Sequence, residues 1–300
     1  MKIAVLIVNY RSDQDTLSLL NQLAECQIPK EVSLKTFVVD NDNSDNLKQS
    51  LKKYKNISYV ESSGNVGFAA GNNIGLKKII EQNFDVIVMM NNDTLVPTDF
   101  IVNISNSKIT DPVIGAIGGL IYFAKGFEYE KGYSQPEKGK VIWYGGGKID
   151  WNNVYVGHEL VNKVDDGRLK EKETSFITGC LLVTKPGVLK KVGLFDERYC
   201  LYLEDADLCE RIKNTGYKLL FDPNIKLWHK VAQGSGIGSS LNDYFLTRNR
   251  LLFGFTYTNF RTKLALLRES LKKLLNGTSA QKMAIRDFLF SNYGWGSWKK

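Results

Sequence analysis

The sequence has few cysteines and histidines, and it lacks the marks of several common classes of protein. Its 300 residues include four cysteines and no C-x-x-C pair, so neither a zinc site nor a disulfide framework is indicated. No apolar run approaches the roughly 18 residues that span a bilayer. Residues 1–9 carry one lysine and a short apolar run, too little for a secretion signal. These absences favour a protein of the reducing cytoplasm.

Two common nucleotide-binding motifs are also absent. The loop at residues 9–13, which follows the first apolar run, contains no glycine. Gly64, Gly67 and Gly71 do not fit G-x-G-x-x-G, and no Walker A sequence occurs. The sequence therefore argues against a dehydrogenase and against a P-loop enzyme.

The net charge of +8 is unevenly distributed. Residues 241–300 carry 11 Lys and Arg against 3 Asp and Glu, whereas residues 1–240 carry 29 of each sign. A neutral body with a basic tail argues against a nucleic-acid-binding protein and indicates a locally basic surface.

Residues 1–95 alternate continuous apolar runs with segments of helical spacing. The runs predict buried strands at 2–9, 33–39, 57–60 and 86–90. Helices are predicted between them, at 16–26, at 47–54 and from after Asn73 to about Gln82. This order predicts an α/β fold with a doubly wound, mostly parallel nucleotide-binding sheet.

Three of these strands end in polar clusters, namely Asn9-Tyr10, Asp40-Asn41-Asp42 and Asn91-Asn92-Asp93. Because parallel strands present their carboxyl ends at one edge of a sheet, the clusters predict a polar, ligand-binding crevice. Asp93, a carboxylate flanked by amides, suits a divalent metal that also carries phosphate oxygens. Asp40 suits a base or a ribose hydroxyl. The alternative is a set of unrelated polar loops.

The second part of the chain is less regular. Residues 110–175 predict a mixed, partly antiparallel region, in which Tyr144 and Trp151 either stack on a sugar or simply pack. A strand is predicted at 176–183, and a pair of strands around Pro223 leads directly to His229, a candidate metal ligand or a structural histidine.

A helix is predicted from Glu204 to about Asn214. Glu204 and Asp205 stand at its start, where the helix dipole stabilises carboxylates, although capping alone would also explain them. Asp207 and Arg211 are four residues apart and can form an ion pair.

Taken in order, these motifs resemble one family over the span from Ile3 to about Arg250. They are Val8-Asn9-Tyr10, Val38-Val39-Asp40-Asn41, Asn65-x-Gly67-Phe68-Ala69-x-Gly71-Asn72-Asn73, Asn91-Asn92-Asp93-Thr94, Thr178-Gly179, Gly193-x-Phe195-Asp196-Glu197, Glu204-Asp205-x-Asp207-Leu208-x-x-Arg211, His229 and Arg248-Asn249. The pattern resembles an inverting glycosyltransferase of family 2 with the GT-A fold. Within that family it is most similar to the rhamnosyltransferase-like branch that builds bacterial surface polysaccharides.

The resemblance implies a metal site and a set of ligand-binding residues. Asp93 would hold Mg²⁺ or Mn²⁺ on the donor diphosphate, and His229 would complete the coordination. Asn91 stands where the family has the first acid of its D-x-D motif, so a ribose contact is implied for it rather than a metal bond. The residues implied to bind the nucleotide sugar are Asn9, Tyr10, Asp40, Asn41, Asn65, Gly67, Asn72, Asn91 and Asn92, and those implied to face the sugars are Thr178, Gly179 and Glu204.

Asp205 matches the general base of the family. A single inverting displacement needs one carboxylate to take the proton of the acceptor hydroxyl, and a metal to neutralise the leaving diphosphate. The implied donor is a dTDP- or UDP-sugar, and the implied acceptor is a glycan or a lipid-linked glycan. The alternatives are a nucleotidyltransferase, or a non-catalytic module that binds glycans or nucleotides.

The chain is expected to divide into a catalytic domain at 1–240, with halves at 1–95 and 96–240, and a helical basic tail at 241–300. In the tail, the helical spacing of the leucines at 264, 267, 271, 274 and 275 predicts an amphipathic helix. With Trp295 and Trp298 it would suit contact with the inner-membrane surface. The alternative is a helix packed on the catalytic domain or against a second subunit in a homodimer.

Overall fold

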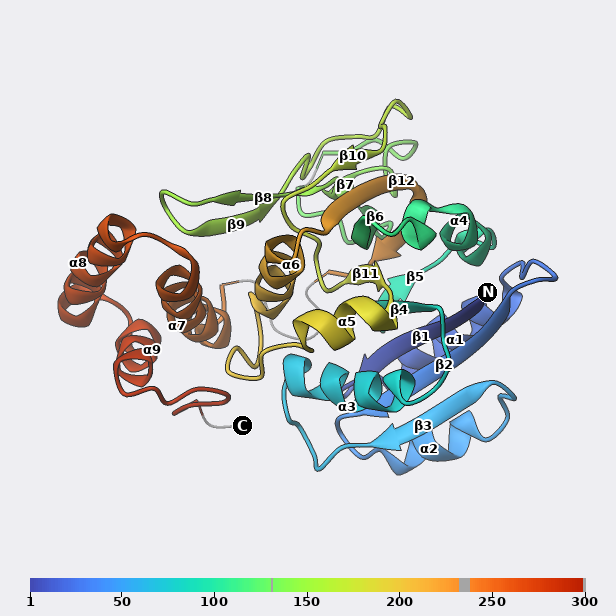
Figure 1. Ribbon diagram of the computed structural model, residues 1–300, viewed down its shortest axis with the longest axis horizontal. Coiled ribbons are helices and arrows are strands. Elements are labelled where there is room, and N and C mark those ends of the chain that lie inside the picture. Colours follow the sequence, from blue (N-terminus) through green and yellow to red (C-terminus); the bar gives the residue numbers. More distant parts are fainter. Residues whose placement is uncertain (131, 232–237, 299–300) are drawn as a thin grey trace.

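The computed structural model describes residues 1–130, 132–231 and 238–298 (Figure 1). A mixed sheet runs through the middle of the protein, and helices pack around it. Three helices at the C-terminal end, coloured orange to red, gather at the end of the protein that lies away from the first three strands.

The elements follow the chain in this order. The strands are β1 Lys2–Asn9, β2 Ser33–Asp40, β3 Ile57–Glu61, β4 Val86–Asn91, β5 Thr94–Leu95, β6 Ile114–Phe123, β7 Ile142–Tyr144, β8 Gly147–Asp150, β9 Tyr155–His158, β10 Lys172–Glu173, β11 Leu181–Thr184 and β12 Lys218–His229. The helices are α1 Asp13–Glu25, α2 Asp45–Leu51, α3 Phe68–Ile80, α4 Phe100–Asn106, α5 Pro186–Val192, α6 Glu204–Asn214, α7 Ser240–Tyr257, α8 Phe260–Asn276 and α9 Ser279–Leu289, with a short 3₁₀ turn at Lys108–Thr110.

The first four long strands form the predicted nucleotide-binding half. β4, β1, β2 and β3 lie side by side in that order, and all three pairings are parallel. Asn9 pairs with Asp40, and Asn91 pairs with Val8, so the polar strand ends meet at one edge of the sheet. The prediction that the polar strand ends meet at one edge is confirmed, and their role as a ligand-binding crevice stays a prediction.

The second half extends the same sheet with mixed polarity. β11 is antiparallel to both β4 and β6, and β12 runs parallel to β6. The prediction of two strands around Pro223 is wrong, because β12 is one strand whose register shifts between Asp222 and Lys226. Proline has no N–H to donate, and at this irregularity no ladder bond is lost.

Two further predicted boundaries are wrong for identifiable reasons. α3 begins at Phe68 and not after Asn73, because Gly67 takes a positive φ of 90° directly before the helix. The strand predicted at 176–183 begins only at Leu181. Residues 178 and 179 leave the ladder, and the Gly179 N–H instead donates to a carboxylate of α6.

The C-terminal helices pack on the protein. Leu251, Leu252 and Phe253 of α7 belong to the same core as the sheet, and the helix predicted from the leucine spacing is α8. Trp295 and Trp298 pack against α7, with ring centroids 5.7 Å from Phe245 and 5.4 Å from Tyr244. Within the described ranges, no helix is both long and apolar enough to cross a membrane.

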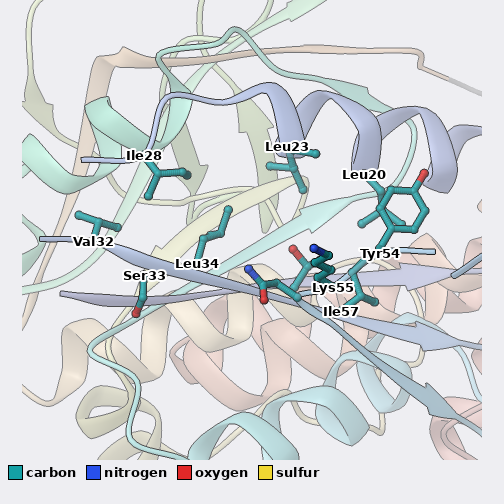
Figure 2. A pocket seen from close by; sticks show the side chains of 12 residues that line it. Leu20, Leu23, Ile28, Val32, Ser33, Leu34, Tyr54, Lys55 and Ile57 are labelled. Carbon is teal, nitrogen blue, oxygen red and sulfur yellow. The ribbon is translucent and has the colours of Figure 1, made fainter. Parts of the chain in front are cut away.

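A groove of about 550 Å³ opens at the other edge of the sheet (Figure 2). Leu20 and Leu23 of α1 line it together with Leu34 and Ile57, which stand at the amino ends of β2 and β3. The polar strand ends of the candidate site lie at the carboxyl ends of these strands. The groove is therefore separate from the candidate site.

Candidate active site

The candidate metal ligands are brought together by a strand pairing. β5, directly after Asp93, pairs antiparallel with the end of β12, so that Thr94 lies opposite His229. The Lys230 N–H donates to the Asp93 carbonyl at 2.9 Å. This pairing places the His229 Nε2 atom 3.1 Å from the Asp93 Oδ1 atom.

Both side chains are largely shielded from solvent, with exposed fractions of 8% for His229 and 16% for Asp93. Burial disfavours the imidazolium form, but the neighbouring Cys180 sulfur and the Asp93 carboxylate outweigh it and raise the pKa of His229. The Nδ1 atom of His229 is buried and has no hydrogen-bond partner among the described residues. Trp143 covers the imidazole edge-to-face, with ring centroids 4.6 Å apart.

The pair fits a divalent metal held partly by substrate. Two neighbouring ligands of an octahedral Mg²⁺ with bonds of about 2.1 Å lie about 3 Å apart, which matches the separation of the two side-chain atoms. In the part of the chain that the structure describes, no three His, Cys, Asp or Glu side chains converge on one point. Mg²⁺ commonly takes only one or two protein ligands and completes its shell with phosphate oxygens and water.

The candidate base, Asp205, lies in the first turn of α6, as predicted. Its carboxylate accepts two backbone hydrogen bonds of 2.8 Å, from the N–H groups of Gly179 and Ala206. Burial raises the pKa of Asp205 to about 6, and the two hydrogen bonds oppose that rise. A carboxylate with such a pKa is ionised at neutral pH and is more basic than an exposed aspartate.

The neighbouring Glu204 has a different character. Its side chain is buried, and its Oε2 atom has no partner within the described residues. Burial and the adjacent Asp205 charge raise the pKa of Glu204 well above its ordinary value, which favours the neutral acid. Asp205 is therefore the ionised carboxylate at this helix start.

The segment at residues 178–180 connects Asp205, the candidate base, to the end of β4, which leads to Asp93. Gly179 donates to Asp205, and the next carbonyl, that of Cys180, accepts from the N–H of Asn91 at 3.1 Å. Gly179 is also tightly surrounded, since an added Cβ would lie 3.2 Å from the Phe68 ring. Thr178 lies buried at the start of this segment.

On the nucleotide side, Asp40 is fully buried and already hydrogen-bonded by the protein. Its carboxylate accepts from the Asn9 amide, the Tyr59 hydroxyl and the N–H groups of Asp42 and Ser44, at 2.7–3.3 Å. A direct bond from Asp40 to a nucleoside would have to replace one of these donors. Its contact with the ligand, like that of the buried Asn9, stays a prediction.

Several other predicted nucleotide residues organise the loop before α3. Asn41 donates to the Asn65 side chain and the Gly67 carbonyl, each at 3.3 Å. Asn72 donates to the Phe68 carbonyl at 3.0 Å. An added Cβ at Gly67 would lie 2.5 Å from the Cys200 sulfur, so this position needs glycine.

The remaining predicted residues lie at the same edge. Asn92 donates to Thr16 at 3.0 Å and so ties the end of β4 to α1, and Asn91 is half-buried beside Asp93. Tyr10 is the exposed member of the set, at 39% exposure, and the Arg11 guanidinium lies over its ring. Tyr144 is fully buried and donates to a backbone carbonyl, and Trp151 stacks on Phe253, so both aromatics have packing roles.

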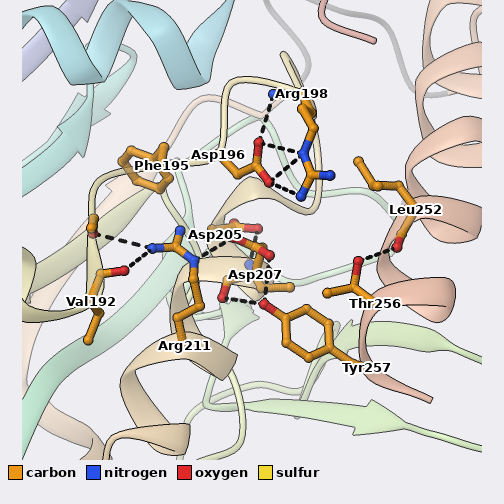
Figure 3. Close-up of polar contacts among 12 residues, drawn as sticks. Val192, Phe195, Asp196, Arg198, Asp205, Asp207, Arg211, Leu252, Thr256 and Tyr257 are labelled. Atoms are coloured by element: carbon orange, nitrogen blue, oxygen red, sulfur yellow. Dashed lines mark hydrogen bonds and ion pairs between the residues drawn. The ribbon is translucent and has the colours of Figure 1, made fainter. Parts of the chain in front are cut away.

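Sequence reasoning missed the contacts that hold α6 from outside (Figure 3). Asp207 pairs with Arg211 at 2.8 Å, as predicted, but its other oxygen accepts a 2.7 Å hydrogen bond from Tyr257 of α7. No sequence signal links residues 50 positions apart. Tyr59 was missed similarly, because it lies in a strand with no polar cluster of its own.

The fold and the site define a class of enzyme. The structure is similar to GalNAc-T7 with UDP, GalNAc and Mn²⁺ (TM-score 0.62, 15% identity, covering 98% of this chain and 58% of that chain). It is also similar to Staphylococcus aureus TarS with UDP-GlcNAc (TM-score 0.59, 14% identity, covering 97% and 80%). The protein has the GT-A glycosyltransferase fold.

The sequence identifies the family. Residues 4–193 match glycosyl transferase family 2, and the chain belongs to that family. A Mycobacterium tuberculosis N-acetylglucosaminyl-diphospho-decaprenol L-rhamnosyltransferase is 23% identical over 71% of this chain and 72% of its own length. The Shigella flexneri dTDP-rhamnosyl transferase RfbF is 24% identical over 83% and 79%. The predicted family, its rhamnosyltransferase-like character and the glycosyltransferase activity are confirmed.

Proposed function

We propose that the protein is a metal-dependent inverting glycosyltransferase that moves a hexose, rhamnose or a similar sugar, from a dTDP- or UDP-sugar. The acceptor is a glycan or a lipid-linked glycan of bacterial surface polysaccharide. The observation that carries this proposal is the placement of Asp205, which two N–H groups hold and which residues 179–180 connect to Asn91, two residues before Asp93 of the Asp93–His229 pair. Two relatives named as rhamnosyltransferases, one of them with a decaprenol-linked acceptor in its name, support the choice of sugar and acceptor.

The chemistry is assigned to few residues. Asp205 takes the proton of the acceptor hydroxyl as that oxygen attacks the anomeric carbon, which inverts the configuration in a single displacement. Asp93 and His229 would hold Mg²⁺ or Mn²⁺, which when bound neutralises charge on the departing diphosphate. Neutral Glu204, with Thr178 and Gly179, lines the side on which the sugars meet.

The polar crevice is assigned to the nucleotide. Exposed Tyr10 is placed to contact the base, and Asn91 to contact the ribose. The buried network around Asp40 and Asn41 shapes this pocket, together with the loop that carries Asn65 and Gly67.

The direct test is a screen of nucleotide sugars for Mn²⁺-dependent binding and slow hydrolysis. We expect Asp93→Ala to lose metal-dependent binding, because the pair that holds the ion is broken. We expect Asp205→Asn to keep donor binding and to lose turnover. If no nucleotide sugar binds with metal to the wild-type protein, this proposal fails.

We also propose that the protein is cytoplasmic and that it contacts the inner-membrane surface with one face of α8. This face carries exposed apolar residues interleaved with exposed cations, namely Phe260 (79% exposed), Leu264 (38%), Leu271 (62%) and Leu275 (76%) with Arg261, Arg268 and Lys272. An apolar stripe flanked by positive charge is complementary to an anionic bilayer, whereas the same face of a second copy would be repelled.

Vesicle sedimentation tests this contact. We expect binding to phosphatidylglycerol vesicles and little to phosphatidylcholine vesicles, with loss on a joint Leu271→Ser and Leu275→Ser change. Salt-resistant dimers that the same double change dissolves would instead make α8 a subunit interface.

A further inference from the structure

Residues 199–203, the loop that leads into α6, have an unusual backbone. Cys200, Tyr202 and Leu203 have positive φ angles of 62°, 68° and 68°. Residues other than glycine seldom adopt this left-handed conformation, because the Cβ atom crowds the backbone. Three such residues within four positions persist only where the surroundings enforce the conformation.

The enforcing contacts come from α7, 47 to 50 residues further along the chain. The Asn249 side-chain amide donates to the carbonyls of Tyr199, Leu201 and Tyr202, at 2.8, 2.7 and 2.9 Å. Its side-chain oxygen accepts from the Arg248 guanidinium at 3.0 Å. Side-chain donors thus replace the backbone partners that a helix or strand would provide for this loop.

Arg248 holds the same loop from the adjacent position. Its Nη2 atom donates to the carbonyls of Arg198 and Tyr199, at 3.1 and 3.0 Å, and its Nη1 atom donates to the Gly294 carbonyl. The side chain is fully buried, and within the described residues it forms no ion pair with a carboxylate. A buried cation is costly to desolvate, and the bonds to the loop carbonyls offset part of that cost, together with the Tyr244 and Phe245 rings that face the guanidinium.

The loop in turn fixes the two sides of the candidate site. The Leu203 carbonyl accepts the N–H of Asp207 at 3.0 Å, so the last left-handed residue starts α6 two positions before Asp205. The Cys200 carbonyl accepts the N–H groups of Phe68 and Ala69, at 2.9 and 3.1 Å, at the start of α3. One loop therefore fixes α6, which carries the candidate base, relative to the start of α3, which is proposed to border the nucleotide.

We infer that Arg248 and Asn249 are positioning residues for the transfer reaction, which act through residues 199–203 to fix the Asp205 carboxylate relative to the donor. The inference rests on the proposed function. It makes α7 a working part of the active site, even though neither side chain reaches the crevice. A displacement of about 1 Å of a catalytic group can cost about 10²-fold in rate, so loosening this loop should mainly reduce turnover.

The test compares Asn249→Ala and Arg248→Lys with Phe253→Leu. Phe253 is a buried α7 residue that stacks on Trp151 and is not hydrogen-bonded to the loop, so its variant controls for general loss of stability. For the two loop variants we expect kcat to fall about 10²-fold and metal-dependent donor affinity to fall much less, because a strand pairing, and not this loop, holds the Asp93–His229 pair. We also expect the pH-rate profile to shift, because Asp205 would leave its two N–H donors. Phe253→Leu should show neither change.

A second readout needs no substrate. Hydrogen exchange of peptides that contain Phe68 and Asp207 should accelerate in the loop variants and not in Phe253→Leu, since these amides donate to loop carbonyls. The inference is overturned if these amides keep their protection, or if kcat falls no further than in the control. Absence of nucleotide-sugar binding by the wild-type protein would instead refute the proposed function, and the exchange result would still decide whether Asn249 holds the loop.

Discussion

Replacing Asp205 by asparagine should have opposite effects on stability and on activity. Burial raises the pKa of Asp205 from an ordinary 3.8 to about 6. The native state therefore binds this proton more tightly than the unfolded chain does, and the wild-type protein loses stability as the pH rises from about 4 to about 6. One pKa unit corresponds to about 1.4 kcal/mol, so the loss reaches about 3 kcal/mol at neutral pH.

The asparagine side chain is uncharged, and it accepts one hydrogen bond fewer than the ionised Asp205 carboxylate. Its side-chain oxygen can accept from either Gly179 or Ala206, whereas the carboxylate accepts from both. This difference exists only where wild-type Asp205 is ionised, because its protonated acid at pH 4 also has one carbonyl oxygen with which to accept. We therefore expect the two proteins to be about equally stable at pH 4, and the variant to be the more stable protein at pH 7.

Urea unfolding of both proteins at pH 4, 5, 6 and 7 measures the difference. The expected signature is a difference in unfolding free energy that moves by about 3 kcal/mol in favour of the variant between pH 4 and 7. A difference that stays constant over this range would show that Asp205 has an ordinary pKa, and would remove the physical basis for its role as base. An Asp196→Asn variant, which changes an exposed ion pair with Arg198, provides the matched control.

The remaining expectations concern activity and two structural contacts. With saturating metal, kcat should rise about tenfold per pH unit below 6 and level off above it, and Asp205→Asn should lower it by about 10²–10⁴-fold; a flat profile would contradict the assignment. Tyr257→Phe removes the hydrogen bond to Asp207 and should cost about 1.5–3 kcal/mol in urea unfolding without changing donor affinity. Gly67→Ala should cost about 1–3 kcal/mol, and adding Cys200→Ala should recover only the part due to the 2.5 Å contact, because the positive φ remains.

The alternation of strands and helices, and the meeting of the polar strand ends at one edge of the sheet, could be predicted because they follow from elementary patterns. Continuous apolar runs mark strands buried on both faces, and parallel strands must end together. The register that sets Asn9 beside Asp40 bears this out. The same reasoning could not tell whether these polar ends face a ligand or each other, since composition does not reveal which donor satisfies which acceptor. In the structure, most of the oxygens of Asp40 and Asn41 are used within the protein.

The tail shows a different limit of sequence reasoning. Its leucine spacing predicted α8, and its charge count predicted a basic surface. A count cannot distinguish exposed Arg268 from fully buried Arg248. Likewise, tryptophan is a residue type that suits a membrane interface, but the rings of Trp295 and Trp298 pack against α7. Long-range packing decides such cases, and one sequence does not contain it in readable form.

The two chemical parts of the site are held by different kinds of structure, and this difference has a functional consequence. Asp93 and His229 are set by the pairing of β5 with the end of β12, in which Thr94 lies opposite His229. Asp205 is set by a loop with three left-handed residues, whose conformation depends on side chains of α7. Perturbations of the C-terminal helices should therefore reach the base before they reach the metal pair. Changes in the tail should therefore reduce transfer more than they reduce metal-dependent donor binding.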